Sequence, residues 1–237
     1  MNKTLLFLLF LITSITLKAQ NEKRPELFST PELKKTILSH KTVAIIPFKI
    51  SVNYINLPNG MTSEMVVNEE LKMGFDLQSG MYTYLKNNSD KYTVQFQELD
   101  KTNIQLIDVG FEATNEVLKP KELCKTVNVD AIIIANYSFY KKVSDENEAK
   151  KNNPYASLKD ELKGDEEEYV SNGGVAHDYR KIQKFTMQIY EAQQGKLLWE
   201  YKIETELNED DLYNSNTLME NIMKMVSNNF PYERIKK

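Results

Sequence analysis

The side chains that most often carry out catalysis are sparse in this sequence. The only histidines are His40 and His177, and the only cysteine is Cys124. A serine or cysteine nucleophile needs a histidine beside it. Cys124 shares the apolar side of an expected helix with Leu123 and Val127, which predicts a packed thiol. Metalloprotease, phosphate-loop, dinucleotide-binding and Gly-x-Ser-x-Gly motifs are also missing. We therefore expect no catalytic residue of these kinds.

Two residue patterns could bind metal ions, and each has a simpler explanation. Met219, Met223 and Met225 could offer thioether ligands to copper(I). However, Met219 and Met223 have the i, i+4 spacing of a buried helix face. The acidic run 165–168 lacks the alternating ligands and central glycine of an EF-hand calcium loop. The sequence predicts no metal and no cofactor.

Carboxylates leave one enzymatic alternative open. A glycosidase needs only two acidic side chains a few ångström apart, and the chain has 34 acidic residues. Such a pair cannot be recognised before the fold is known. The alternative function is therefore a secreted carboxylate-dependent hydrolase. Because 30 basic residues leave a net charge of −4, we expect no nucleic-acid partner.

The first 19 residues have the pattern of a secretory signal peptide. Lys3 supplies the positive charge, and residues 5–15 form an apolar run shorter than the roughly 20 residues that span a bilayer. Lys18 ends the run, and Ala19 offers a small residue for cleavage. We expect cleavage between Ala19 and Gln20, and no membrane span in the remaining chain. The alternative is an uncleaved anchor at the membrane surface.

Two continuous apolar runs predict the centre of a sheet. Residues 43–46 and 131–135 have no polar alternation, which is typical of strands that are covered by helices on both faces. Pro47 ends the first run, and residues 49–60 are interpreted as a loop. A long helix is expected over 62–85, with a kink or break near Gly74 because glycine is a weak helix former. Shorter elements are expected at 30–39 (helix), 92–96 (strand), 102–110 (helix), 120–127 (helix) and from 215 or 216 to 229 (helix).

Residues 144–180 are interpreted as a mobile polar loop between two strands. The segment has ten acidic and five basic residues and few large apolar ones. It cannot bury enough surface to offset the entropy of ordering it. It also lacks the alternating apolar residues of a membrane hairpin.

A β-hairpin is expected over 182–204, because apolar and polar residues alternate on both sides of a turn at Gly195. We expect the first hairpin strand to pair antiparallel with the strand at Ala131. Glu200, Lys202 and Glu204 should face water. The odd-numbered face should meet the helices: Phe185, Met187, Ile189, Leu197, Trp199, Tyr201 and Ile203.

The expected fold is α/β (α+β): a mixed four- to five-stranded sheet with helices mainly on one face, ending in a β-hairpin and a C-terminal helix. The expected organisation is a signal peptide (1–19), an N-terminal arm with a short helix (20–40) and one α/β domain (41–237) that contains the 144–180 loop.

Three short motifs resemble those of bacterial periplasmic domains. They are Val-Ala-Ile-Ile-Pro-Phe at 43–48, which includes Pro47 and Phe48, the segment 127–133 around Asp130, and Gly-Lys-Leu-Leu-Trp from Gly195 to Trp199. In this order they are similar to motifs of the TolB amino-terminal domain, LpoB and CsgG. The end of the leader, Lys-Ala-Gln at 18–20, resembles export signals common in Bacteroidetes.

The resemblance implies a non-catalytic envelope protein that binds other proteins. We accordingly expect a periplasmic or extracellular accessory protein with a protein partner in envelope assembly or transport. The five motif residues are expected to have structural roles. No cysteine follows the leader, so we do not expect the acyl anchor of a lipoprotein. The sequence leaves the partner and the oligomeric state open.

Overall fold

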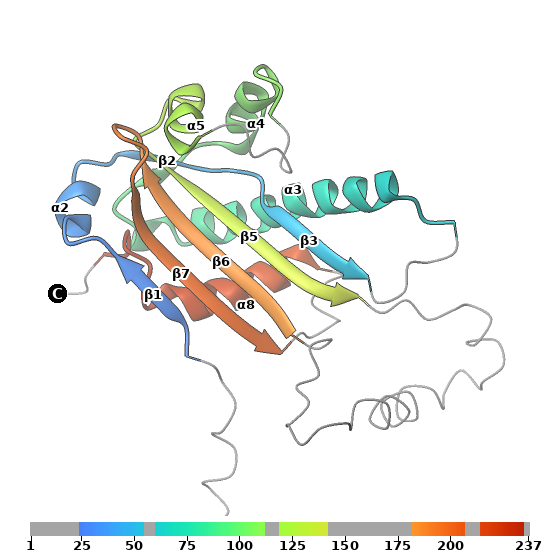
Figure 1. The fold of residues 1–237 in the computed structure, drawn as a ribbon. Coiled ribbons are helices and arrows are strands. Elements are labelled where there is room, and N and C mark those ends of the chain that lie inside the picture. The colour runs from blue at the N-terminus through green and yellow to red at the C-terminus, as the bar shows by residue number, and fades with distance from the viewer. Residues whose placement is uncertain (1–23, 55–59, 112–118, 142–181, 207–213, 235–237) are drawn as a thin grey trace, which may run out of the picture.

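A computed structural model describes residues 24–54, 60–111, 119–141, 182–206 and 214–234. Within these residues the chain forms one mixed sheet of seven strands with helices packed against it (Figure 1). This confirms the α/β class, the terminal hairpin and the C-terminal helix. The predicted signal peptide, with its cleavage site at Ala19 and Gln20, and the predicted loop at 144–180 lie outside the described residues.

The strands follow the order β1-β7-β6-β5-β2-β4, and β3 also pairs with β5. β5 pairs antiparallel with β6 but parallel with β2 and β3, so the sheet is mixed. The bounds of the strands are β1 Glu26–Ser29, β2 Thr42–Ile45, β3 Lys49–Tyr54, β4 Gln95–Phe96, β5 Ala131–Lys141, β6 Ile182–Glu191 and β7 Leu197–Glu206.

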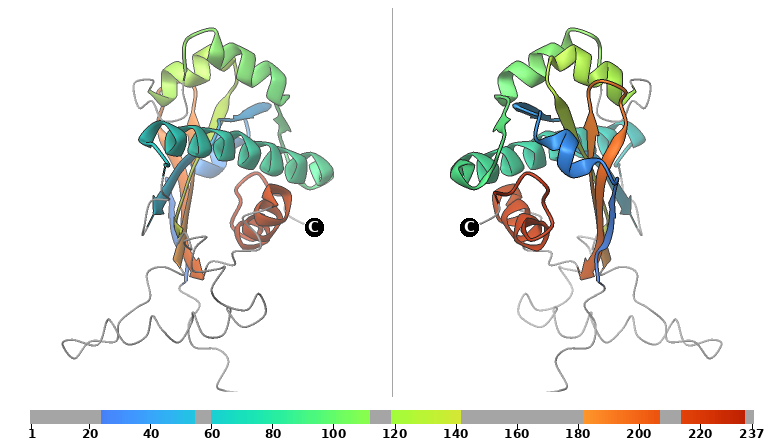
Figure 2. Two further views of the ribbon diagram at one scale, coloured as in Figure 1. Left: turned by 90° about the vertical axis from the view of Figure 1, so that its right-hand side faces the viewer. Right: turned by 90° about the vertical axis from the view of Figure 1, so that its left-hand side faces the viewer.

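Two helices cover one face of the sheet and two others pack on the opposite face at one end. α3 (Ser63–Asn87) and α8 (Ser215–Ser227) pack against each other behind the sheet of Figure 1. α4 (Leu99–Ile107) and α5 (Pro120–Val127) lie where β5 begins. Figure 2 shows the sheet nearly edge-on, with α8 on one side of it. The short elements α2 (Leu33–Ile37) and η2 (Ser89–Lys91) complete the set.

The hydrophobic core is divided by the sheet. The larger cluster joins the α3 and α8 face to alternate residues of β5, β6 and β7, including Ile133, Met187 and Trp199. The smaller cluster joins α4 and α5 to the opposite side of β2 and β5 and includes Ile132. Because β2 and β5 are covered on both faces at this end, their continuous apolar runs have the pattern expected of central strands.

The predicted loop at 49–60 is wrong in its first half, because Lys49–Tyr54 forms β3. Ile45 pairs with Ile133 and Lys49 pairs with Asn136. Three residues, 46–48, therefore lie opposite two residues of β5, which defines a bulge. Pro47 has no N–H to leave unpaired at this point, so the proline interrupts the strand without ending the pairing with β5.

The predicted kink near Gly74 is also wrong, because α3 is continuous from Ser63 to Asn87. The reason for the glycine is a close approach between the helix and the bulge. The N–H of Phe48 donates to the Gly74 carbonyl at 3.2 Å. A Cβ atom on Gly74 would lie 2.3 Å from the Phe48 carbonyl oxygen. The backbone contact therefore requires a residue without a side chain.

The sheet has seven strands rather than the four or five expected. The extra strands are β3 and β1, and β4 is shorter than the predicted strand at 92–96. All four residues of β1 are exposed, so its sequence has no alternation of buried apolar residues that would predict a strand. β1 belongs to the sheet because it pairs with β7, from Glu26 opposite Lys202 to Ser29 opposite Trp199.

The hairpin pairs antiparallel with β5 as predicted, with Ala131 opposite Glu191. One register detail differs. Ile189 pairs with Trp199 but Tyr190 pairs with Leu197, so Leu198 is an extra residue in β7. This bulge places Leu197 on the face opposite Trp199, and the expected odd-numbered pattern fails at that residue.

The expected water-facing residues of the hairpin also differ in exposure. Lys202 is exposed, whereas Glu200 and Glu204 are half-buried. The side chain of Glu200 is only 15% exposed, because it accepts from Gln188 Nε2 at 2.5 Å and pairs with Lys202 at 2.7 Å. A cross-strand contact with Gln188 and an ion pair within β7 therefore cover part of the charge that the alternation pattern places in water.

Helix α8 begins one residue earlier than predicted. Asn214, not Ser215 or Asn216, is the N-cap, and its Oδ1 accepts from the N–H groups of Asn216 and Thr217. Met219 and Met223 are fully buried in the larger core, which confirms that they pack rather than form a surface stripe.

Asp130 and His40 connect the start of the sheet to the C-terminal segment. Asp130 Oδ2 accepts from the N–H groups of Lys41 at 2.8 Å and Thr42 at 2.9 Å. His40 Nδ1 lies 2.7 Å from the buried Tyr232 hydroxyl. Burial raises the pKa of Asp130, but the two backbone donors outweigh it and the net pKa is below the usual value. Burial lowers the pKa of His40, against the opposing charges of Asp130 and Glu191.

We expect acidification to destabilise the protein through His40. The unfolded histidine binds a proton below about pH 6.5, whereas the buried imidazole resists protonation. Stability is therefore full above pH 6.5 and falls as the pH drops from there through the lower pKa of the folded state. Urea unfolding at several pH values between 7.5 and 5.5 measures this slope. The slope should be shallower in His40→Gln than in the unsubstituted protein. Equal slopes in the two proteins would contradict this origin.

Candidate functional site

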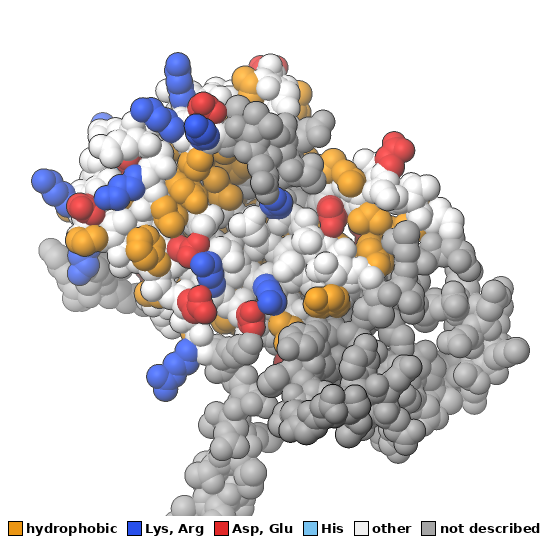
Figure 3. Space-filling view, viewed as in Figure 1, with side chains coloured by type: hydrophobic (Ala, Val, Ile, Leu, Met, Phe, Trp, Pro, Cys, Tyr) orange, Lys and Arg blue, Asp and Glu red, His pale blue; other side chains and the backbone are white. Residues whose placement is uncertain are grey.

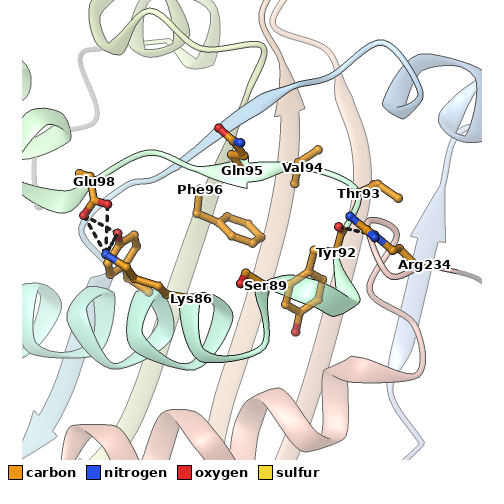
Figure 4. A pocket seen from close by; sticks show the side chains of 10 residues that line it. Lys86, Ser89, Tyr92, Thr93, Val94, Gln95, Phe96, Glu98 and Arg234 are labelled. Atoms are coloured by element: carbon orange, nitrogen blue, oxygen red, sulfur yellow. Dashed lines mark hydrogen bonds and ion pairs between the residues drawn. The ribbon is translucent and has the colours of Figure 1, made fainter.

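A pocket of about 510 Å³ lies between α3 and the edge strand β4. We call it the β4 groove. Figure 4 shows Arg234 at one end of it and Lys86 with Glu98 at the other. Its lining comes from α3, η2, β4 with its flanking residues, and the C-terminal segment: Tyr82, Lys86, Ser89, Tyr92, Thr93, Val94, Gln95, Phe96, Glu98 and Arg234. A volume of this size is within the range of ligand-binding pockets.

Backbone contacts fix Arg234 at its end of the groove. The Arg234 N–H donates to the Lys91 carbonyl, and Nε donates to the Tyr92 carbonyl, each at 2.8 Å. Between described residues, none of the ion pairs involves Arg234. A guanidinium has five N–H donors in a planar fork. Because Nε is engaged, the terminal nitrogens are the donors that remain to bind a planar anion.

The opposite end of the groove is a closed polar cluster. Lys86 Nζ donates to both carboxylate oxygens of Glu98, at 3.1 and 3.3 Å, and to the Tyr82 hydroxyl at 3.0 Å. The Tyr82 hydroxyl in turn donates to Glu98. These contacts lower the pKa of Glu98, first through the Tyr82 hydrogen bond and then through Lys86. Because the three ammonium protons of Lys86 have partners, its charge is compensated within the cluster.

A second surface is the part of the sheet opposite α3 and α8 that α4 and α5 do not reach. We call it the open sheet face. It carries the alternate residues of five strands, and the register places these residues in rows across the sheet. Its residues are Glu26, Phe28, Lys49, Ser51, Asn53, Asn136, Ser138, Tyr140, Ile182, Lys184, Thr186, Gln188, Leu197, Glu200, Lys202, Glu204 and Glu206. Ile134 and Tyr190 form its border with the smaller core.

The open sheet face has an apolar part and a charged part. Figure 3 shows hydrophobic side chains gathered beside α5, and Lys and Glu side chains lower on the same face. At the border with α5, Ile134 and Tyr190 are half-buried and pack against the smaller core, and Leu197 is half-buried opposite Tyr190. Two aromatic side chains on this face are well exposed, Phe28 at 47% and Tyr140 at 38%. Large exposed aromatic side chains are typical of protein interfaces.

The charged part contains ion pairs in mid-strand positions. Lys184 Nζ lies 3.1 Å from Glu204 Oε1, and Lys202 Nζ lies 2.7 Å from Glu200 Oε1. Ion pairs of partly exposed side chains contribute about 0 to 1 kcal/mol to stability. Their contribution to the fold is therefore small.

The five motif residues lie in four segments, and none of them lines the β4 groove. Pro47 and Phe48 form the bulge between β2 and β3, and Phe48 belongs to the larger core. Asp130 precedes β5, and Gly195 lies in the hairpin turn with φ +70°. Trp199 is 1% exposed and stacks on Tyr201 with ring centroids 6.1 Å apart. Trp199 and Tyr201 are therefore core residues rather than an exposed pair that could anchor a partner.

Sequence reasoning identified none of the residues at either surface as a site. The β4 groove joins Arg234 to segments 138 to 152 positions earlier, such as Phe96 and Tyr82, and no local pattern carries that information. A signal did exist for β3, because Ile50 and Val52 alternate with Lys49, Ser51 and Asn53.

Among the described residues, the carboxyl groups with shifted pKa values are stabilised in the ionised form. Glu32, Glu98 and Asp130 all have pKa values below the usual range. A glycosidase needs one carboxylic acid whose pKa is raised, so that it can protonate the leaving group. Cys124 is 1% exposed, and burial raises its pKa to about 12. This confirms the packed thiol and places Cys124 far from the thiolate form.

Comparisons with known proteins give structural likenesses at low identity. The LpoB C-terminal domain from Salmonella enterica is 9% identical with a TM-score of 0.35, over 75% of this chain and 94% of that one. The lipoprotein GNA1162 from Neisseria meningitidis is 8% identical with a TM-score of 0.38, over 79% and 99%. The PelC dodecamer from Paraburkholderia phytofirmans is 12% identical with a TM-score of 0.37, over 90% and 99%.

No family model and no curated protein matches the sequence. In the part of the chain that the structure describes, no helix is both long enough and apolar enough to cross a membrane.

Proposed function

We propose that this chain is a non-enzymatic accessory protein of the bacterial envelope, exported by a signal peptide cleaved between Ala19 and Gln20, that binds a protein partner through the open sheet face. The observation that carries the proposal is the composition of that face. It combines two well-exposed aromatic side chains, Phe28 and Tyr140, with charged side chains of both signs.

The charge of the open sheet face favours a protein over a polyanion. Four acidic and three basic side chains give it a formal charge of −1: Glu26, Glu200, Glu204 and Glu206 against Lys49, Lys184 and Lys202. Nucleic acids and anionic lipid surfaces select for basic excess. A nearly balanced mixture around aromatic side chains fits a protein interface, where charges fix orientation and aromatic residues contribute affinity.

Site-specific photo-crosslinking tests this function. A photoreactive phenylalanine at Lys202, in the middle of the face, should form a discrete adduct in envelope extract of the bacterium that produces the chain. The same amino acid at Ser79, an exposed position of α3, is the matched control and should not. The substitution Phe28→Ser should reduce the adduct at Lys202 at least fivefold, because it removes an exposed aromatic side chain from the same face.

Two outcomes would contradict the proposal. Equal adducts at Lys202 and Ser79 would mean that the open sheet face has no preference for a partner. Turnover of a glycan or peptide that disappears in Glu98→Gln would support the carboxylate-dependent hydrolase instead. The Glu98 test is chosen because Glu98 is the acidic residue that lines the only pocket described above.

A further inference from the structure

The β4 groove has features that the proposed partner surface does not use. It lies at the edge of the sheet beyond β2, whereas the open sheet face extends from β5 and β3 to β1 on the other side. It has one uncompensated charge, an aromatic floor and a strand edge along one wall. These three features point to a ligand of defined chemistry.

The charge is positive and lies at the Arg234 end. Lys86 and Glu98 compensate each other at 3.1 Å, which leaves the guanidinium as the net charge among the lining residues. The Nε contact with the Tyr92 carbonyl fixes the plane of the guanidinium. A planar fork held in one orientation binds a carboxylate through two parallel hydrogen bonds.

The floor between the two ends is aromatic. Phe96 is half-buried, and its ring contacts Tyr92 edge-on with centroids 5.6 Å apart. Figure 4 places both rings between Arg234 and Lys86. An apolar side chain next to the bound carboxylate would cover this surface.

The remaining wall is the outer edge of β4. The N–H groups of Gln95 and Gln97 donate to the carbonyls of Lys41 and Val43, at 2.8 and 2.9 Å. Backbone groups alternate in direction along a strand, so those of Val94 and Phe96 point away from β2. β4 ends the sheet, and a terminal strand can pair with an added peptide.

We propose that the β4 groove binds the C-terminal end of an extended peptide, which pairs antiparallel with residues 94–96 and places its terminal carboxylate on Arg234. The direction follows from the positions of the ends. Arg234 lies beside Thr93, at the beginning of β4, and Glu98 follows its end. A peptide that ends at Arg234 therefore runs opposite to β4. The aromatic floor selects an apolar last residue.

Calorimetric titration of the purified protein tests the inference with defined probes. The probes are N-acetyl-Ala-Ala-Ala-X tetrapeptides with X as Phe, Leu or Ala, each as the free acid and as the C-terminal amide. We expect the Phe or Leu acid to bind saturably and its amide to bind at least tenfold more weakly. Arg234→Gln should also bind the acid at least tenfold more weakly than the unsubstituted protein. Arg234→Lys should recover part of this affinity, because lysine keeps the positive charge but lacks the planar guanidinium.

A second variant separates binding from folding. Arg234→Gln also removes the contact with the Tyr92 carbonyl and could loosen the C-terminal segment. Ser89→Trp leaves Arg234 intact and fills the groove from an exposed position of η2, so it should abolish binding without lowering stability. Lys202→Ala, on the open sheet face, should leave binding unchanged, so this result is independent of the proposed partner surface.

Three results would overturn the inference. The first is that none of the free acids saturates the protein at concentrations up to about 1 mM, which corresponds to a binding free energy of about −4 kcal/mol. The second is that the acid and the amide bind with equal affinity. The third is that Ser89→Trp keeps full affinity. Hydrocinnamate is the small-molecule comparison. If it binds as tightly as the Phe tetrapeptide, the groove takes a small aromatic carboxylate and the pairing with residues 94–96 is wrong.

Discussion

Replacing Trp199 by alanine should lower the free energy of unfolding by about 3 to 5 kcal/mol, the range for truncating a fully buried aromatic side chain. Trp199 is 1% exposed and contacts Tyr201 and Phe230, whose ring centroids lie 6.1 Å away. Its removal would leave a cavity between β7 and the C-terminal segment, bounded by side chains that cannot all move into it.

Chemical denaturation followed by far-ultraviolet circular dichroism measures this loss, because Trp199 is the only tryptophan and its fluorescence disappears with it. The matched control is Lys202→Ala, on the same strand and the opposite face, which should change stability by less than about 0.5 kcal/mol. Lys202 is a better control than Glu200, whose side chain has two polar partners. A near-neutral Trp199→Ala would mean that the covered face of the sheet is assigned wrongly.

The sequence predicted the elements whose pattern depends on burial. The runs at 43–46 and 131–135 are central strands because helices cover both faces at that end of the sheet. The hairpin was predicted because one of its faces meets α3 and α8 while the other does not. In each case the buried positions are apolar, either at every second residue or at all residues, and this pattern can be recognised in the local sequence.

The elements that the sequence missed depend on contacts between distant segments. β1 has four exposed residues and is a strand only because its backbone pairs with β7. Pro47 predicts the end of a strand, because nothing in the local sequence shows that β5 continues to pair with the chain beyond the bulge. The extra residue Leu198 in β7 could not be predicted either, because the register shift depends on the pairing of β7 with β6.

The β4 groove could not be predicted from the sequence, and the open sheet face could be predicted only in part. The β4 groove needs the fold to bring Arg234 beside Tyr92, and the guanidinium is held by a backbone carbonyl rather than by a charged partner. Neither feature produces a motif. The open sheet face was predicted in part, since Lys202 and Glu200 were expected on the outer side of the hairpin, but the width of the face follows from β1 and β3.

Replacing Gly74 by alanine should destabilise the protein by about 2 to 3 kcal/mol, although alanine is the better helix former by about 1 kcal/mol. The new Cβ would lie 2.3 Å from the Phe48 carbonyl oxygen. This oxygen cannot rotate away, because the bulge is fixed on one side by the hydrogen bond of Ile46 to the Ile133 carbonyl. Either α3 or the bulge must shift, and overpacking of a close contact costs about 1 to 3 kcal/mol or more.

A graded series separates the close approach from helix propensity. Ser79→Ala, at an exposed position of α3, should be neutral or slightly stabilising, because it changes propensity alone. Gly80→Ala should be intermediate: its Cβ would lie 2.7 Å from the Ser215 carbonyl oxygen and 3.0 Å from the flexible Met219 side chain. Urea denaturation should therefore rank stability as Ser79→Ala, then Gly80→Ala, then Gly74→Ala. If Gly74→Ala were as stable as Ser79→Ala, α3 would have to lie farther from the bulge than the Phe48 hydrogen bond places it, and the reason for the glycine would be lost.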